Sequence, residues 1–281
     1  MVYPTLTQAR ATGRKLLAVL IDPDKARKDN LELLADYAAA GHVDLFLWGG
    51  SLVNAPQAEF YLRLLKASTS VPVVLFPGST YQLDANADAI FLLSLLSGRN
   101  PDLLIGRHVQ VAGRLKRMQL ETMPTGYLLI DGGKPTSVSY MSNTTPIPAD
   151  KAAIAAATAL AGQQLGMGLI YMDAGSGAQQ PVTPEMIACV RREIDLPLVV
   201  GGGIRTPERA AQALHAGADM VVVGNGLERD SSWLPELATA VHEVGADAGA
   251  LNIEKEQGGG SSVVTEEPQR VQVSRVMSER S

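Results

Sequence analysis

The sequence predicts an α/β fold in which eight parallel strands, alternating with helices, close into a single barrel. Short apolar runs recur along the chain at intervals that leave room for a helix between most of them. These runs are apolar at nearly every position, as in strands buried on both faces of a parallel sheet. A chain of 281 residues with 46% hydrophobic residues is long enough for the core of such a TIM barrel. A doubly wound open sheet is the alternative arrangement of these elements.

The expected strands end in glycine-rich or polar segments, which mark the loops that follow them. In chain order the strands span 16–22, 44–50, 72–78, 89–96, 126–133, 168–175, 197–203 and 219–226. Amphipathic segments between them predict helices, and several begin with Asp or Thr-Pro and end at Gly, as helix termini favour. The expected helices span 29–41, 57–68, 103–118, 149–166, 183–194, 206–217 and 234–245.

One helix of the regular alternation is missing from this pattern. Between the strands at 72–78 and 89–96 the chain has room for a turn or a short strand, but not for a full helix. We therefore predict a modified barrel whose third helix is missing or vestigial. The barrel is expected to form a single domain over 1–254. The Gly/Ser-rich and charged remainder, 255–281, is expected to be a flexible C-terminal tail.

Composition and charge argue against several classes of protein. The net charge of −5 and the lack of a basic block argue against nucleic-acid binding. No apolar run is long enough to span a bilayer, and no signal-peptide cleavage site follows the first apolar run. The single cysteine, Cys189, excludes an internal disulfide and fits a cytoplasmic location. The histidines show no metal-ligand spacing and are expected to be structural: His42, His108, His215 and His242.

Glycine-rich segments follow the last three expected strands and predict a phosphate site. They read DAGSGA (173–178), GGGIRTPE (201–208) and GNG (224–226). Backbone N–H groups can converge on a phosphate where no Cβ blocks its approach, and a helix N-terminus adds partial positive charge. TIM barrels often bind phosphate in the loops after strands seven and eight. Tight turns alone are the alternative explanation.

Three polar residues at strand ends are candidates for metal binding or catalysis. Asp22 ends the first strand in LIDPDK, and Ser51 follows the second strand in WGGS. A carboxylate and a hydroxyl with open positions for water suit Mg²⁺ held jointly with a substrate phosphate. For Asp22, a turn residue ahead of Pro23 is the alternative. Asp173, at the end of the sixth expected strand, is a candidate general base, or a carboxylate that only orders its loop through N–H bonds.

Taken together, these segments resemble the geranylgeranylglyceryl phosphate synthase family, which includes the bacterial heptaprenylglyceryl phosphate synthases. The resemblance runs in order over roughly residues 15–245 through LIDPDK, WGGSLV, PVVLFPGS, IYMDAGSGA, VVGGGIRTPE and VVVGNGLE. It is to the branch with DPD after the first strand. Another branch has a lysine two residues before that Asp, where this chain has Leu20, and Lys25 is the candidate for its phosphate-related role. The resemblance also implies a TIM barrel without its third helix.

The resemblance implies a prenyltransferase of ether phospholipid biosynthesis. The C3 hydroxyl of sn-glycerol 1-phosphate attacks C1 of a polyprenyl diphosphate, expected to be geranylgeranyl diphosphate, and diphosphate leaves. Asp22 and Ser51 are then expected to hold Mg²⁺. Tyr127 and Asp173, which replaces the Glu of many relatives, are expected to be catalytic. The residues expected to bind glycerol phosphate are Tyr171, Met172, Asp173, Ala174, Gly175, Ser176, Gly177, Gly202, Gly203, Gly224 and Asn225. A homo-oligomer, dimer or hexamer, is also implied.

A long isoprenoid needs an apolar groove, and the gap left by the missing helix is the expected place for it. Candidate lining residues, for which ordinary core packing is the alternative, are Phe76, Tyr81, Leu83, Phe91 and Leu95. The chain has no DDxxD motif, which argues against the helical prenyl synthases. Two other functions stay open, a phosphate-binding barrel isomerase or synthase of another pathway and a non-catalytic barrel scaffold. Peripheral contact with a membrane is compatible with the absence of an expected transmembrane segment.

Overall fold

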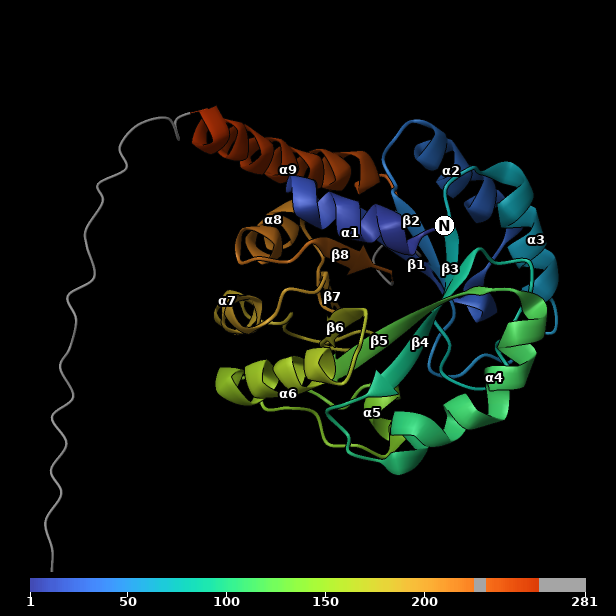
Figure 1. The fold of residues 1–281 in the computed structure, drawn as a ribbon. Coiled ribbons are helices and arrows are strands. Elements are labelled where there is room, and N and C mark those ends of the chain that lie inside the picture. The colour runs from blue at the N-terminus through green and yellow to red at the C-terminus, as the bar shows by residue number, and fades with distance from the viewer. Residues whose placement is uncertain (225–230, 258–281) are drawn as a thin grey trace, which may run out of the picture.

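In the computed structural model the chain folds into a closed barrel of eight parallel strands, which confirms the predicted fold class and excludes the doubly wound sheet (Figure 1). The structure describes residues 1–224 and 231–257. Each strand pairs with the next along the chain, and the last pairs with the first. The strands are β1 (Leu16–Ile21), β2 (Leu45–Trp48), β3 (Val73–Leu75), β4 (Ala89–Leu95), β5 (Glu121–Leu129), β6 (Leu169–Asp173), β7 (Leu198–Gly201) and β8 (Met220–Val223).

Helices surround the barrel, and most of them connect one strand to the next. They are α1 (Tyr3–Thr12), α2 (Lys28–Ala39), α3 (Ala58–Ser68), α4 (Arg107–Met118), α5 (Ser137–Ser142), α6 (Ala152–Gln164), α7 (Pro184–Glu193), α8 (Pro207–His215) and α9 (Leu234–Gln257). Two short turns complete the set, a 3₁₀ turn η1 (Pro23–Lys25) and a π-helical turn η2 (Asp102–Gly106). None of these described helices is long and apolar enough to cross a membrane.

The core has two layers, because neighbouring residues of a strand face opposite sides of the sheet. In β1, Leu17 and Val19 belong to the cluster that packs the strands against the helices. Leu16 and Ala18 belong to the second cluster, which fills the inside of the barrel. Strands buried on both sides explain why the sequence shows continuous apolar runs rather than alternation.

The third helix is absent, as predicted. The residues between β3 and β4, 76–88, are described throughout and contain no helix. Helix α4 holds this segment in place through two arginines. Arg107 Nη1 donates to the carbonyl of Gly78 at 3.2 Å, and Arg114 Nη2 donates to the carbonyl of Leu83 at 2.9 Å. A loop tied down by side chains therefore takes the place of a helix here.

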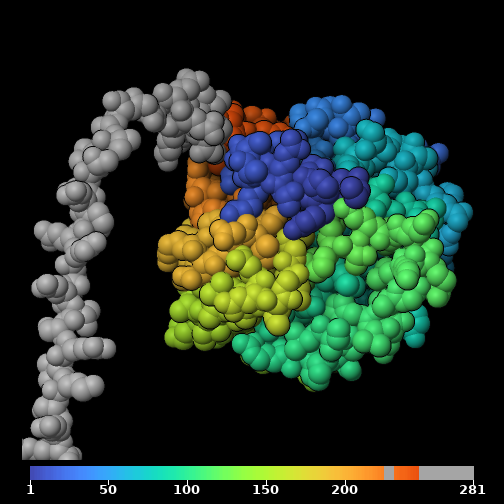
Figure 2. Space-filling view, in the orientation of Figure 1, coloured from blue at the N-terminus to red at the C-terminus, as the bar shows by residue number. Residues whose placement is uncertain are grey.

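Helix α1 was not expected from the sequence. It covers one end of the barrel, in front of the strands in Figure 1, and forms the blue surface of Figure 2. Its buried side chains, Leu6 and Ala9, pack into the cluster inside the barrel. The backbone N–H of Tyr3 donates at 2.9 Å to Glu121, the first residue of β5. With only two buried side chains in ten residues, the helix has too weak an apolar pattern to be recognised.

Strand β5 begins earlier than predicted and ends earlier too. The prediction of 126–133 began at the apolar run, and Pro124 before it is a residue that disfavours a strand interior. The structure instead pairs β5 with β4 over seven residues, from Ala89↔Glu121 to Leu95↔Tyr127. Tyr127 therefore lies near the carboxyl end of β5, close to the loop that follows it, and not at the start of the strand as predicted.

Candidate active site

The carboxyl ends of the strands open into a cavity of about 950 Å³, which is the size of many small-molecule sites. This is the end at which TIM barrels place their active sites. One part of the cavity is polar and is lined by Asp22, Ser51, Asp173 and Ser176. The other part is apolar and extends from the barrel mouth toward α4, lined by Leu83, Leu92, Leu93, Leu103 and Val111. The cavity thus suits a ligand with a charged head and an apolar tail.

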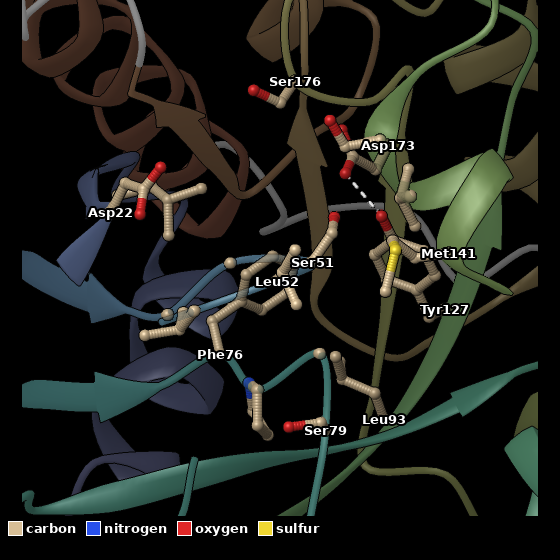
Figure 3. A pocket seen from close by; sticks show the side chains of 18 of the residues that line it. Asp22, Ser51, Leu52, Phe76, Ser79, Leu93, Tyr127, Met141, Asp173 and Ser176 are labelled. Carbon is tan, nitrogen blue, oxygen red and sulfur yellow. Dashed lines mark hydrogen bonds between the residues drawn. The ribbon is translucent and has the colours of Figure 1, made fainter. Parts of the chain in front are cut away.

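A buried carboxylate–phenol pair lies in the polar part of the cavity (Figure 3). The Tyr127 hydroxyl donates to Asp173 Oδ2 at 2.5 Å, and the backbone N–H of Gly175 donates to Asp173 Oδ1 at 2.7 Å. The pair comes from β5 and β6, whose register places Tyr127 beside Tyr171, two residues before Asp173. Both oxygens of the carboxylate are therefore held in a fixed orientation.

The electrostatics of this pair decide which member can accept a proton. Burial raises the pKa of Asp173, although the hydrogen bonds from Tyr127 and Gly175 act to lower it. Burial and the neighbouring Asp173 carboxylate together raise the pKa of Tyr127 well above that of an ordinary tyrosine. At neutral pH Tyr127 keeps its proton and donates it as a hydrogen bond. Asp173 is the group of the pair that can act as a base.

The glycine-rich loops after β6 and β7 pack against each other beside Asp173. Gly175, Gly177, Gly202 and Gly203 all have positive φ, from 72° to 86°, a conformation that other residues rarely adopt. A Cβ on Gly202 would lie 2.6 Å from Asp173 Oδ1 and 2.7 Å from the backbone nitrogen of Gly175. The turns therefore require glycine for folding, and they also leave bare backbone on the cavity wall. The structure supports both explanations of the glycines.

Most of the residues expected to bind substrate surround the cavity. Those that line it are Tyr171, Asp173, Ser176, Gly177, Gly202, Gly203 and Gly224, together with the expected catalytic residue Tyr127. The side chains of Met172 and Ala174 instead pack in the core between strands and helices, so only their backbone faces the loops. Gly175 contributes its N–H to Asp173. Asn225 lies outside the described residues, and its expected role stays a prediction.

Asp22 lies across the cavity mouth from Asp173 and has two local partners. Its Oδ1 accepts the N–H of Asp24 at 3.0 Å, so it begins the η1 turn, and its Oδ2 lies 3.3 Å from Lys25 Nζ. A Cβ on Gly50, next to Ser51, would lie 3.8 Å from Asp22 Oδ1, so the ends of β1 and β2 are close neighbours. The carboxylate is thus a turn residue that also faces the cavity.

This corner fits a magnesium ion only in part. Among the described residues no group of three His, Cys, Asp or Glu side chains gathers to hold a metal. Asp22 offers one carboxylate and Ser51 one hydroxyl, both on the cavity wall. Mg²⁺ commonly binds through one or two carboxylates and takes its other ligands from substrate phosphates and water. The donor set therefore suits Mg²⁺ that arrives with a phosphorylated substrate, and not a site closed by protein alone.

Two parts of the cavity wall were missed by the sequence analysis. Helix α5 contributes Val138 and Met141, yet its six residues are too few to show a periodic pattern. His108 was expected to be structural, and it lines the cavity on α4. Its Nδ1 is a buried side-chain nitrogen without a hydrogen-bond partner among the described residues. The signal for His108 was its position three residues before the core residue Val111, on one face of the helix.

Residues 10–244 match the PcrB family over most of the chain. The chain belongs to this family. Relatives of high identity are the geranylgeranylglyceryl phosphate synthase of Spirosoma linguale, 51% identical over 85% of this chain and 96% of the relative, and that of Thermococcus gammatolerans, 47% identical over 78% and 86%. The resemblance stated from the sequence motifs is thereby confirmed.

Solved structures place this PcrB family chain in the same group. The (S)-3-O-geranylgeranylglyceryl phosphate synthase of Thermoplasma acidophilum, crystallised with its substrate sn-glycerol 1-phosphate, has a TM-score of 0.81 and 33% identity, over 86% of this chain and 99% of that chain. A thiamine phosphate pyrophosphorylase of Pyrococcus furiosus has a TM-score of 0.53 at 14% identity over 85% and 98%, and shares only the fold.

Proposed function

We propose that this PcrB family protein is a geranylgeranylglyceryl phosphate synthase-type prenyltransferase. It joins C1 of a polyprenyl diphosphate to the C3 hydroxyl of sn-glycerol 1-phosphate through an ether bond and releases diphosphate. The observation that carries the proposal is one cavity that combines the Tyr127–Asp173 pair, bare glycine backbone and a long apolar lining. The identity of the acceptor comes from the Thermoplasma relative, whose crystals contain sn-glycerol 1-phosphate.

The acceptor phosphate binds at the glycine-rich loops after β6 and β7. Gly177, Gly202 and Gly203 line the cavity there, and their backbone carries no side chain that would block a phosphate oxygen. Ser176 lies on the same wall and adds a hydroxyl. Binding at this end directs the C3 hydroxyl of the glycerol toward the buried carboxylate.

Asp173 removes the proton of the C3 hydroxyl as the ether bond forms. Burial raises its pKa, which makes the ionised carboxylate a stronger base than an exposed one. Tyr127 and the N–H of Gly175 hold both of its oxygens, so the base is oriented before the substrate arrives. Asp173 is one methylene shorter than the Glu of many relatives, and Tyr127 fixes its position within the cavity.

The donor diphosphate binds at the Asp22 corner, and its prenyl chain enters the apolar part of the cavity. Asp22 and Ser51 are the residues that would hold Mg²⁺, which when bound neutralises the charge of the leaving diphosphate. Lys25, within 3.3 Å of Asp22, is a further cation at this corner. The apolar lining between the barrel mouth and α4 removes the prenyl chain from water.

The test is incubation of the purified protein with Mg²⁺, sn-glycerol 1-phosphate and prenyl diphosphates of several lengths. We expect a prenyl glyceryl phosphate ether, detected by mass spectrometry, with geranylgeranyl diphosphate among the accepted donors. Asp22→Asn should abolish turnover if it holds the metal, and omission of Mg²⁺ should do the same. If no donor gives an ether, the proposed function is wrong. If turnover is unaffected by a chelator, the proposed role of Mg²⁺ is wrong, while the proposed prenyl transfer stands.

We further propose that the protein forms a homo-oligomer through α6. The segment 152–172 contains no charged residue. On α6 Ile154 is 47% exposed, and beyond its end Leu165 is 74% exposed. Exposed apolar side chains on an uncharged helix are typical of surfaces that another chain covers.

A further inference from the structure

Four aromatic rings form one cluster inside the barrel, and three of them also line the cavity. The rings are those of Phe76, Phe91, Tyr127 and Tyr171, one after β3 and one each from β4, β5 and β6. Phe76 stacks on Tyr171, with ring centroids 5.1 Å apart and planes at 22°. It meets Phe91 edge-on at 6.3 Å and Tyr127 at a tilt at 6.1 Å. This set is called the aromatic cluster below.

Phe76 is the member of the aromatic cluster that is most open to the cavity. It is 9% exposed, against 4% for Tyr127, 1% for Tyr171 and 0% for Phe91. Phe76 lines the cavity, whereas Phe91 does not. Both were candidates for the prenyl groove, with core packing as the alternative. Phe76 faces the cavity, whereas Phe91 is a core residue wholly inside the barrel.

The backbone fixes the position of Phe76 closely. Its N–H donates to the carbonyl of Trp48 at 2.8 Å, which continues the pairing of β3 with β2. A Cβ on Gly49 would lie 2.2 Å from the carbonyl oxygen of Phe76, so these two chain segments touch without room for a side chain. The ring is thus part of a rigid wall and not of a mobile loop.

Phe76 lies between the two polar sides of the cavity. Figure 3 shows Asp22 on one side, the Tyr127–Asp173 pair on the other, and Phe76 with Ser51 and Leu52 between them. Under the proposed function, the first side binds the diphosphate and the second binds the attacking hydroxyl. The reacting allylic carbon of the donor must lie between them, over this part of the wall.

We propose that the aromatic cluster, through the ring of Phe76, stabilises the positive charge that develops on the allylic carbons of the prenyl donor. This inference rests on the proposed function. The C1–O bond breaks, and its electron pair leaves with diphosphate. The C3 hydroxyl oxygen gives a lone pair to C1, and its proton passes to Asp173. Positive charge on the allyl group is greatest between these events, and an aromatic face attracts a cation through its ring quadrupole.

The stacking explains why a cluster serves this purpose better than a single ring. Tyr171 and Phe91 pack against the Phe76 ring, so it need not reorient as charge appears. A phenyl ring also stabilises a cation without offering a lone pair, and so it cannot capture the allylic carbon. A carboxylate or hydroxyl at position 76 would compete with the acceptor for that carbon.

The test replaces Phe76 by 4-fluoro-, 3,5-difluoro- and 3,4,5-trifluorophenylalanine, which are of similar size and have progressively weaker ring quadrupoles. We expect kcat for ether formation to fall with each step, by about tenfold for the trifluoro ring, with log kcat linear in the cation affinity of the ring. The same three residues at Phe46, which is fully buried on β2 outside the aromatic cluster and does not line the cavity, are the matched control, and kcat there should stay within about twofold of the wild type. Thermal unfolding of every variant checks that the fold is kept.

The outcomes separate this inference from the proposed function. If the unmodified protein forms no ether, the proposed function fails. If it forms the ether and the Phe76 series is flat, only the role of Phe76 is overturned. A fall of equal size at Phe46 would likewise overturn it, because packing would then be the cause. A donor with fluorine on C2, which disfavours an allylic cation, should slow the wild type, and an unchanged rate would contradict charge development at these carbons.

Discussion

Asp173 combines two properties that oppose each other, burial and negative charge. It is 8% exposed, and burial raises its pKa, so ionisation of this carboxylate costs folding free energy. Because its folded pKa lies above the unfolded value, this cost is absent below the unfolded pKa, grows as the pH rises from the unfolded to the folded pKa, and is complete above the folded pKa. Proteins retain such a cost where activity requires it.

Asp173→Asn should therefore stabilise the fold while it removes the base. We expect kcat for ether formation to fall at least about 100-fold, and the melting temperature at pH 7 to match or exceed that of the wild type. At a pH below the ordinary pKa of Asp the two proteins should have similar melting temperatures. An unchanged kcat would exclude Asp173 as the base, and Asp173→Glu, which keeps the charge, is the control for activity.

His108 also carries a polar atom whose burial costs free energy. Its buried Nδ1 lacks a partner among the described residues, and such an atom costs about 1–3 kcal/mol relative to one that is hydrogen-bonded. His108→Phe should raise the free energy of unfolding by about 1 kcal/mol, measured by urea denaturation. Gln110→Leu, at an exposed position of the same helix, is the control and should change little. A loss of stability at position 108 would show that Nδ1 is hydrogen-bonded in solution.

At the scale of elements, the sequence predicted what depends on local pattern and missed what depends on tertiary contact. All eight strands were found, because runs such as 16–21 are apolar throughout. The missing third helix was also found, because chain length alone excludes it. Helix α1 and the early start of β5 were missed because both depend on tertiary contacts. Glu121 accepts a hydrogen bond from the backbone N–H of Tyr3, and Pro124 lies in the part of β5 that pairs with β4.

Helix α9 is tied to the barrel by a hydrogen bond to a buried carboxylate whose strength depends on pH. His242 Nε2 on α9 lies 2.9 Å from Asp44 Oδ2, and Asp44 also accepts the N–H of Leu17 in β1 at 2.9 Å. Burial opposes ionisation of Asp44, yet hydrogen bonds from His242 and Leu17, with the charge of Arg14, outweigh it and lower its pKa. The stability this gives is present above the unfolded pKa of Asp and is lost as the pH falls through the folded pKa.

Asp44→Asn should consequently lower the free energy of unfolding at pH 7 by about 1–3 kcal/mol, and by less at a pH below the ordinary range of Asp. Urea unfolding of both proteins across pH 3–7 measures the difference. Asp29→Asn, which changes an exposed carboxylate of α2, is the control and should show no such trend. A pH-independent loss in Asp44→Asn would mean that charge does not provide the stabilisation.

At the scale of the molecule, oligomer formation is the property least accessible to one sequence. The resemblance implied a dimer or hexamer. Because Ile154 and Leu165 are exposed, we propose that α6 forms one contact between subunits. Leu165→Glu should shift the mass measured by light scattering to a smaller species, with no loss of helix content. The control Gln8→Glu, on the exposed side of α1, should leave the measured mass unchanged. A monomeric wild type would overturn the interface, while the proposed reaction would stand.

The site shows why motif order reveals more than any single residue. Asp22, Ser51, Asp173 and the glycines are far apart in sequence, and only the barrel brings their strand ends to one cavity. The sequence could predict that gathering because every loop after a barrel strand lies at the same end. It could not predict that Phe76 faces the cavity and Phe91 does not, since both lie within apolar runs. Nor could it show that Met172 turns away from the cavity.

One measurement tests the central claim most directly. The protein is given Mg²⁺, geranylgeranyl diphosphate and sn-glycerol 1-phosphate that carries ¹⁸O at the C3 hydroxyl, and the products are analysed by mass spectrometry. We predict that the label appears in the ether product and that the released diphosphate is unlabelled, because the acceptor oxygen attacks C1 while the donor C–O bond breaks. The absence of an ether product, or an ether without the label, would contradict the account.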